Sequence, residues 1–228
     1  MKCPRCQSGN VTKNGSIIAA RGRVQRFECK ECGKKFHTPL SEQPITERAG
    51  YWDIETSQAG RGAGNFGILY CWAIRDRDSK VVIGDFMHRL SQKEEKRVVT
   101  TMLKEMRNYD RLYTWYGVGH DAPISRSRAE YYGLDFPGYQ DVLHTDLYFS
   151  FRPKFKLHSN KQDVVAEFFE QPPQQHTLRP TTWIKAHFPD TFKDAMKHIY
   201  EHCREDVAQT QWIHERIEKY MMGTRRTL

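Results

Sequence analysis

The chain has 228 residues, which is enough for one full domain and a smaller one. Its 12 Phe, 11 Tyr and 5 Trp are too many bulky side chains for a disordered protein. No stretch approaches the roughly 18 apolar residues of a transmembrane helix, and the N-terminus lacks the apolar core of a signal peptide. We therefore expect a cytoplasmic protein of a prokaryotic or phage-infected cell, with no membrane partner and with reduced cysteines.

Basic residues are concentrated near the N-terminus. The first 50 residues hold ten Lys or Arg and four Asp or Glu, a formal charge of +6, whereas the remaining residues hold 26 and 24, a charge of +2. A basic patch attracts polyanions, of which nucleic acid is the usual one. Charge alone leaves open the alternative that these residues only keep a small module soluble.

Two Cys-x-x-Cys pairs in this basic segment predict a metal site. Cys3 and Cys6 are separated by 22 residues from Cys29 and Cys32. Two such turns can surround one Zn²⁺ ion tetrahedrally. The alternative, a redox-active pair, uses one Cys-x-x-Cys rather than two and usually lies in a βαβ unit. We therefore expect one structural zinc ion per chain.

The segment between the cysteine pairs has the pattern of a small β-sheet. Residues 11–13 and 17–19 flank Asn14-Gly15, which predicts a hairpin turn, and residues 23–27 alternate as a third strand. Together with Cys-Pro-x-Cys and Gln-Arg-Phe-x-Cys-Lys-x-Cys-Gly, this stretch resembles the zinc ribbons of transposase-associated and phage proteins, over residues 1–37. The resemblance implies a nucleic-acid-binding or protein-docking module. The candidate contacts to phosphates are Arg23, Arg26, Lys30, Lys34 and Lys35.

Residues 38–50 contain two prolines and lack periodicity, which predicts a linker to a second domain over residues 51–228.

In the second domain, Ser91 and Glu94 predict a capping box at the start of a helix. A glycine-rich loop at 58–65 lacks the Gly-Lys-Ser/Thr of a P-loop. Three strands followed by alternating helices and strands predict an α/β fold with a mixed sheet. The expected strands are 51–56, 66–75, 80–86, 111–116 and 142–145, and the expected helices are 91–108, 121–133, 161–169, 181–187 and 192–221.

Acidic residues in three distant segments are candidate metal ligands. Asp53 and Glu55 lie two positions apart on the first strand of this domain and so share one face. Adjacent carboxylates repel each other unless a cation such as Mg²⁺ or Mn²⁺ binds to both. Asp121 follows a glycine-containing turn, and its alternative role is to cap the next helix. Asp206 lies beside the apolar stripe of the last helix, one turn after His202, and a surface His–Asp pair is the alternative.

Taken together, these motifs resemble the DEDD family of exonucleases, which have a ribonuclease-H-like fold. The matching motifs are Asp53-x-Glu55, the segment from Tyr116 to Asp121, and His202-x-x-x-Asp206, over about residues 51–220. Asn usually stands at the position of Tyr116. Family members carry a Tyr with three intervening residues before the last Asp, or a His with four, so the histidine here occupies the tyrosine spacing.

The resemblance implies a 3′→5′ exonuclease that hydrolyses DNA or RNA by a two-metal mechanism. His202 would accept the proton of the attacking water, and Thr56 would help to hold the terminal nucleotide. The expected partners are single-stranded 3′ ends and replication or repair proteins. Two alternatives remain, namely a non-catalytic module that binds or is recruited to nucleic acid, and a structure-specific endonuclease of the same fold. The two Mg²⁺ or Mn²⁺ ions would be held by Asp53, Glu55, Asp121 and Asp206.

Overall fold

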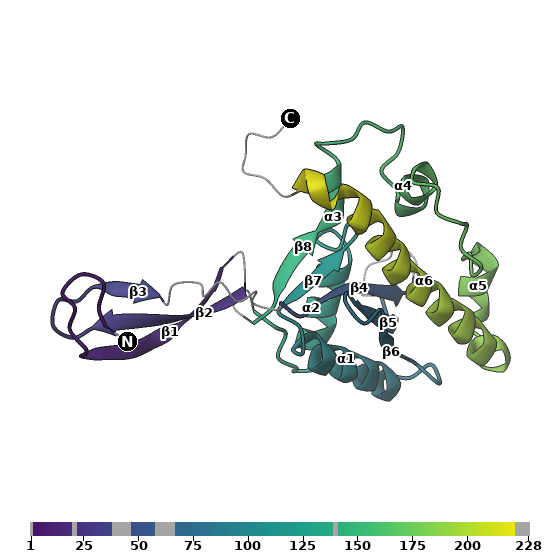
Figure 1. The fold of residues 1–228 in the computed structure, drawn as a ribbon. Coiled ribbons are helices and arrows are strands. Elements are labelled where there is room, and N and C mark those ends of the chain that lie inside the picture. Colours follow the sequence, from purple (N-terminus) through teal and green to yellow (C-terminus); the bar gives the residue numbers. More distant parts are fainter. Residues whose placement is uncertain (1, 20–21, 38–46, 58–66, 139–140, 222–228) are drawn as a thin grey trace.

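The computed structural model describes residues 2–19, 22–37, 47–57, 67–138 and 141–221 (Figure 1). Within these residues the strands form two sheets that share no strand pairing. The first sheet has three strands and includes Cys29, and the second has five strands and carries Asp53 and Glu55. No helix among the described residues is both long enough and apolar enough to cross a bilayer.

The N-terminal sheet has the order β1-β2-β3 and is antiparallel throughout, with β1 at Val11–Ala19, β2 at Gly22–Cys29 and β3 at Lys35–His37. The hairpin turn predicted at Asn14-Gly15 is wrong, because β1 continues through these residues and pairs with β2 on both sides of them. The register instead shifts between Lys13 and Ser16, and Gly15 has a φ of +70°. A bulge uses the positive φ of glycine just as a turn would.

The five-stranded sheet begins earlier than expected. Strand β4 starts at Ala49, so residues 49–50 belong to the sheet and not to the predicted linker, whose residues 38–46 lie outside the described part of the chain. Gly50 is required at this position, because a Cβ atom there would lie 2.9 Å from side-chain atoms of Ile74 and Tyr109. Close packing therefore explains a glycine that the sequence pattern assigns to a linker.

This sheet is mixed, as predicted. Its order is β6-β5-β4-β7-β8, in which β4, β5 and β6 pair antiparallel while β4, β7 and β8 pair parallel. The strand expected at 66–75 starts at Leu69 and ends at Asp76. The strands are β4 (Ala49–Thr56), β5 (Leu69–Asp76), β6 (Val82–Phe86), β7 (Arg111–Thr114) and β8 (Leu143–Asp146).

The helices follow the prediction except for one short helix. Ser91 caps α1 by accepting a hydrogen bond from the Glu94 backbone N–H at 3.3 Å, but the Glu94 carboxylate bonds to the N–H of His88, so only half of the capping box forms. Helix α3 was not predicted, and Asp146 caps it by accepting from the Tyr148 N–H at 3.0 Å. The helices are α1 (Gln92–Met106), α2 (Asp121–Tyr131), α3 (Leu147–Phe151), α4 (Gln162–Phe168), α5 (Pro180–Lys185) and α6 (Pro189–Met221).

Helices cover both faces of the five-stranded sheet. Helix α6 packs along one face (Figure 1). On this face the Tyr51 hydroxyl lies 2.8 Å from His214 Nδ1. On the other face, the indole N–H of Trp72 donates to Thr101 on α1. Because side chains alternate along a strand, Asp53 and Glu55 lie on the same face of β4 as Tyr51 and point towards α6. The fold therefore brings β4 and the last helix together.

Candidate active site

The carboxylates from three distant segments converge where β4 meets α2 and α6. Asp121 Oδ1 accepts a hydrogen bond from the Ile54 backbone N–H at 3.1 Å, which fixes it against β4. On α6, His202 Nε2 lies 3.3 Å from Asp206 Oδ2 and 3.7 Å from Glu55 Oε1. Glu55, His202 and Asp206 each offer one ligand atom, and these atoms lie within 4.8 Å of one another. Asp53, Glu55, Asp121, His202 and Asp206 form what we call the carboxylate cluster.

Removal from water and mutual repulsion make this cluster costly when it is fully ionised. The pKa of Asp53 is held well above its usual value, first by desolvation and then by the charges of Asp121, Asp206 and Glu55. Desolvation likewise raises the pKa of Glu55, and it raises the pKa of Asp121 to about 7. Asp53 Oδ2 is buried and has no hydrogen-bond partner among the described residues. Carboxylates placed in this way fit divalent cations, which supply the missing positive charge.

Asp121 does not cap α2. The cap position belongs to His120, whose side chain forms no capping hydrogen bond, while Asp121 is 3% exposed and turned towards β4. The alternative role of Asp121 as a helix cap is therefore wrong. Instead, Asp121 accepts the Ile54 N–H, and its charge adds to desolvation in raising the pKa of Asp53, on the same strand as Ile54.

Asp146 holds the loop that precedes Asp121. Its Oδ1 accepts from the Tyr116 N–H at 3.0 Å, and its Oδ2 accepts from the Val118 N–H at 2.9 Å. Tyr116 adopts a φ of 62°, and a Cβ on Gly119 would lie 2.5 Å from its ring. This left-handed, closely packed loop is strained for a tyrosine. From the sequence, Asp146 is an acidic residue near a strand end that would make fold-stabilising polar contacts or help to hold a third metal ion, and its contacts in the fold are of the first kind.

Gln174 is a residue that sequence reasoning misses. Its side-chain Nε2 donates to Asp206 Oδ1 at 2.6 Å. The same segment is docked on α6 by His176, which donates its backbone N–H to Glu205 at 3.1 Å and places its Nδ1 at 2.7 Å from the same carboxylate. Gln174 lies in a stretch rich in Pro and Gln that reads as a loop. No local pattern links it to Asp206, which lies 32 positions further along the chain.

The four N-terminal cysteines also converge. The Sγ atoms of Cys3 and Cys32 lie 3.6 Å apart, and those of Cys6 and Cys29 lie 3.5 Å apart. Four thiolates at about 2.3 Å from a tetrahedral zinc ion are separated by about 3.8 Å. Cys3 Sγ also accepts the backbone N–H of Arg5 at 3.4 Å. The cluster is therefore compatible with a small zinc site.

The predicted nucleic-acid contacts do not all face the solvent. Lys35 on β3 is exposed, as are Lys30 and Lys34 between β2 and β3, whereas Arg26 is half-buried. Arg23 belongs to β2, but its side chain lies outside the described part of the structure. Thr56 follows Glu55 directly, yet its side chain is buried, with 6% exposed.

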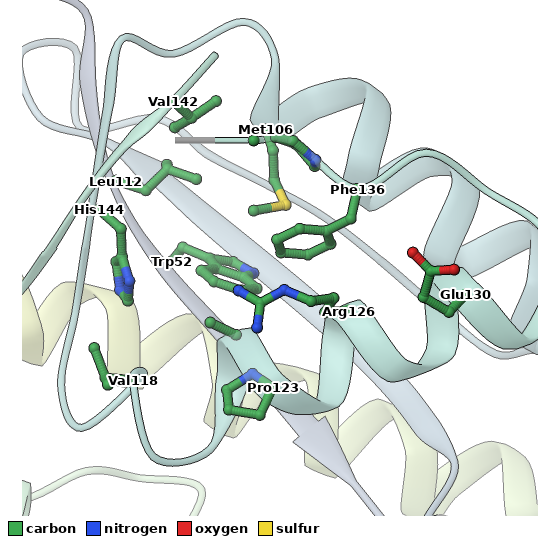
Figure 2. A pocket seen from close by; sticks show the side chains of 13 residues that line it. Trp52, Met106, Leu112, Val118, Pro123, Arg126, Glu130, Phe136, Val142 and His144 are labelled. Carbon is green, nitrogen blue, oxygen red and sulfur yellow. The ribbon is translucent and has the colours of Figure 1, made fainter. Parts of the chain in front are cut away.

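A separate cavity of about 460 Å³ lies beside α2 (Figure 2). It is lined by Trp52 and Phe136, and Arg126 lies with its guanidinium 5.3 Å from the Phe136 ring centre. Trp52 is next to Asp53 on β4 and therefore points to the opposite face of the sheet. The cavity is thus distinct from the carboxylate cluster.

Comparisons with known proteins agree with this fold. Residues 50–218 match the family model of the RNase H superfamily. Among solved structures, the family B DNA polymerase from the hyperthermophilic archaeon Pyrobaculum calidifontis is similar, with a TM-score of 0.60 and 17% identity. The match covers 78% of this chain and 25% of the polymerase chain, so this chain spans about a quarter of that protein's length. No curated protein matches the sequence.

Proposed function

Because this chain belongs to the RNase H superfamily, we propose that it is a metal-dependent nuclease that removes nucleotides from the 3′ ends of DNA or RNA. The observation that carries the proposal is the carboxylate cluster. Three segments that are far apart in sequence place acidic groups against one another, with Ile54 N–H on Asp121 and with His202 between Glu55 and Asp206. Repulsion between buried carboxylates lowers the stability of the fold, so it is not expected in a core that only stabilises the structure.

In this proposal the chain's own residues hold and orient the divalent ions. Asp121 is fixed by the Ile54 N–H, and Asp206 is fixed by the Gln174 amide, so two of the ligands are positioned before any ion binds. Two bound Mg²⁺ or Mn²⁺ ions would supply an activated water and stabilise the leaving 3′ oxygen. The ligands of these ions would be Asp53, Glu55, Asp121 and Asp206.

The N-terminal sheet would hold the nucleic acid near this site. Its four cysteines would bind one structural Zn²⁺, which supplies much of the folding free energy of so small a module. The exposed ammonium groups of Lys30, Lys34 and Lys35 would then contact phosphates, as would Arg26. Binding of this kind depends on salt and carries little sequence preference, which suits an enzyme that acts on strand ends.

The decisive experiment incubates the pure protein with 5′-labelled single-stranded DNA and RNA in the presence of Mn²⁺ or Mg²⁺. An exonuclease yields a ladder that shortens from the 3′ end and releases nucleoside 5′-monophosphates. Asp53→Ala should abolish this ladder. The matched control Asp194→Asn, an exposed carboxylate on the same α6 helix as Asp206, should leave it unchanged.

The other outcomes separate the alternatives. Internal cuts without mononucleotides would identify a structure-specific endonuclease. Binding of the labelled strands without metal-dependent turnover would identify a binding module. Cleavage that persists unchanged in Asp53→Ala would reject the carboxylate cluster as the active site.

A further inference from the structure

We propose that His202 binds one of the divalent ions directly through Nε2, so that the site prefers a first-row transition metal to Mg²⁺. This inference rests on the proposed function, because it assigns a role within the same metal site. It replaces the proton-accepting role that the sequence resemblance implies for this histidine. The evidence is the position of Nε2 and the chemistry of the donor set.

The spacing of the three side chains fits a set of ligands around one ion. His202 Nε2 lies 3.3 Å from Asp206 Oδ2 and 3.7 Å from Glu55 Oε1. Ligand atoms about 2.1 Å from an ion are about 3.0 Å apart in octahedral geometry and about 3.4 Å apart in tetrahedral geometry. The observed distances approach these separations. His202 and Asp206 also stand one turn apart on α6, a spacing at which a helix presents two ligands to the same side.

A general base would be placed differently. It must reach the proton of the attacking water, so a water molecule stands between its nitrogen and the ion. Here Nε2 instead faces the two carboxylate oxygens that are themselves candidate ligands.

The donor set decides which ions the site favours. Carboxylates and water suit Mg²⁺, whereas an imidazole nitrogen suits transition metals, whose affinities rise from Mn²⁺ towards Cu²⁺. Mg²⁺ usually binds through one or two carboxylates and keeps several waters. One nitrogen ligand beside two carboxylates therefore shifts the metal preference of the site away from Mg²⁺. Mn²⁺ is a suitable probe of this site because it is paramagnetic.

The test is pulsed EPR on the full-length protein loaded with Mn²⁺. Wild type should show ¹⁴N modulation from a directly bound imidazole, and labelling the histidines with ¹⁵N should change that pattern. His202→Gln should lose the modulation and bind Mn²⁺ at least about tenfold more weakly, with a smaller loss for Mg²⁺. The control His198→Gln removes a histidine one turn earlier on α6, where Nε2 lies 3.1 Å from the Thr177 carbonyl, and should keep the modulation.

Each contrary outcome overturns a defined part of the argument. If Mn²⁺ binds to wild type without ¹⁴N modulation, direct ligation by His202 is rejected, whereas the proposed nuclease function is not. An unchanged ratio of Mn²⁺ to Mg²⁺ affinity in His202→Gln also contradicts it. No Mn²⁺ binding at all overturns both this inference and the proposed function. If His202→Gln does not fold, the comparison of ¹⁴N and ¹⁵N wild type alone decides the question.

Discussion

Replacing Gln174 with Ala should weaken metal binding although this side chain is not itself an expected ligand. Its amide donates to Asp206 Oδ1 at 2.6 Å and thereby fixes the orientation of that carboxylate. The same hydrogen bond lowers the pKa of Asp206, against the larger effect of desolvation that raises it. Loss of the amide therefore leaves Asp206 both freer to rotate and easier to protonate, and both changes oppose the binding of a cation.

The structure sets the size of the expected effect. A hydrogen bond to a charged group contributes about 1.5–3 kcal/mol. Since each 1.4 kcal/mol corresponds to about a factor of ten, Gln174→Ala should lower the Mn²⁺ affinity by about 10- to 100-fold. This range agrees with the cost of removing a residue that orients a metal ligand in other proteins, which is also about 10- to 100-fold.

Isothermal titration of Mn²⁺ into wild type and variant measures the change. The control is His176→Ala, which removes the Nδ1 contact of the same segment with Glu205, keeps the backbone hydrogen bond to that carboxylate, and does not touch Asp206. If His176→Ala weakens binding as much as Gln174→Ala, the docking of the segment and not the amide is responsible. An affinity of Gln174→Ala within about twofold of wild type, against the tenfold minimum expected, refutes the reasoning.

Three further changes test other parts of the molecule. Arg128→Met should lower the free energy of unfolding by about 3–5 kcal/mol, because it leaves the carboxylate of Glu95 buried without its guanidinium partner. Denaturant titration measures this free energy, and a loss below about 1 kcal/mol contradicts the prediction. Desolvation raises the pKa of Asp121 from 3.8 to about 7, so between these values the folded state binds more protons than the unfolded state and stability falls as pH rises. Without added divalent metal, Asp121→Asn should therefore raise the Tm more at about pH 8 than at about pH 5, and a pH-independent difference argues against the shift. Cys29→Ser should abolish stoichiometric zinc while the five-stranded domain stays folded, and elemental analysis that still finds one zinc per chain excludes a four-cysteine site.

The sequence predicts well where local patterns decide the structure. The apolar stripe between Phe192 and Tyr220 predicts α6, which extends three residues further at its start. Alternation along β4 correctly places Asp53 and Glu55 on one face. Their approach to Asp121 and Asp206 is a long-range property, and from the sequence only the resemblance to a nuclease family points to it.

Where the prediction failed, tertiary contacts outweigh local preference. The Asn14-Gly15 sequence is compatible with a bulge as well as with a turn. A bulge forms here because β1 pairs with β2 on both sides of these residues. Gly50 reads as part of a linker, but it is needed where Ile74 and Tyr109 approach the backbone. Helix α3 has five residues, too few to show helical periodicity.

The central claim is that acidic groups from distant segments jointly bind divalent metal, and counting bound Mn²⁺ tests it most directly. Equilibrium dialysis should find two Mn²⁺ ions per wild-type chain, in keeping with a two-metal site. Asp53→Asn removes the charge of a residue whose Oδ2 has no hydrogen-bond partner among the described residues, and it should bind fewer ions. A wild type that binds no Mn²⁺, or an Asp53→Asn variant that binds as many ions as wild type, would contradict the claim.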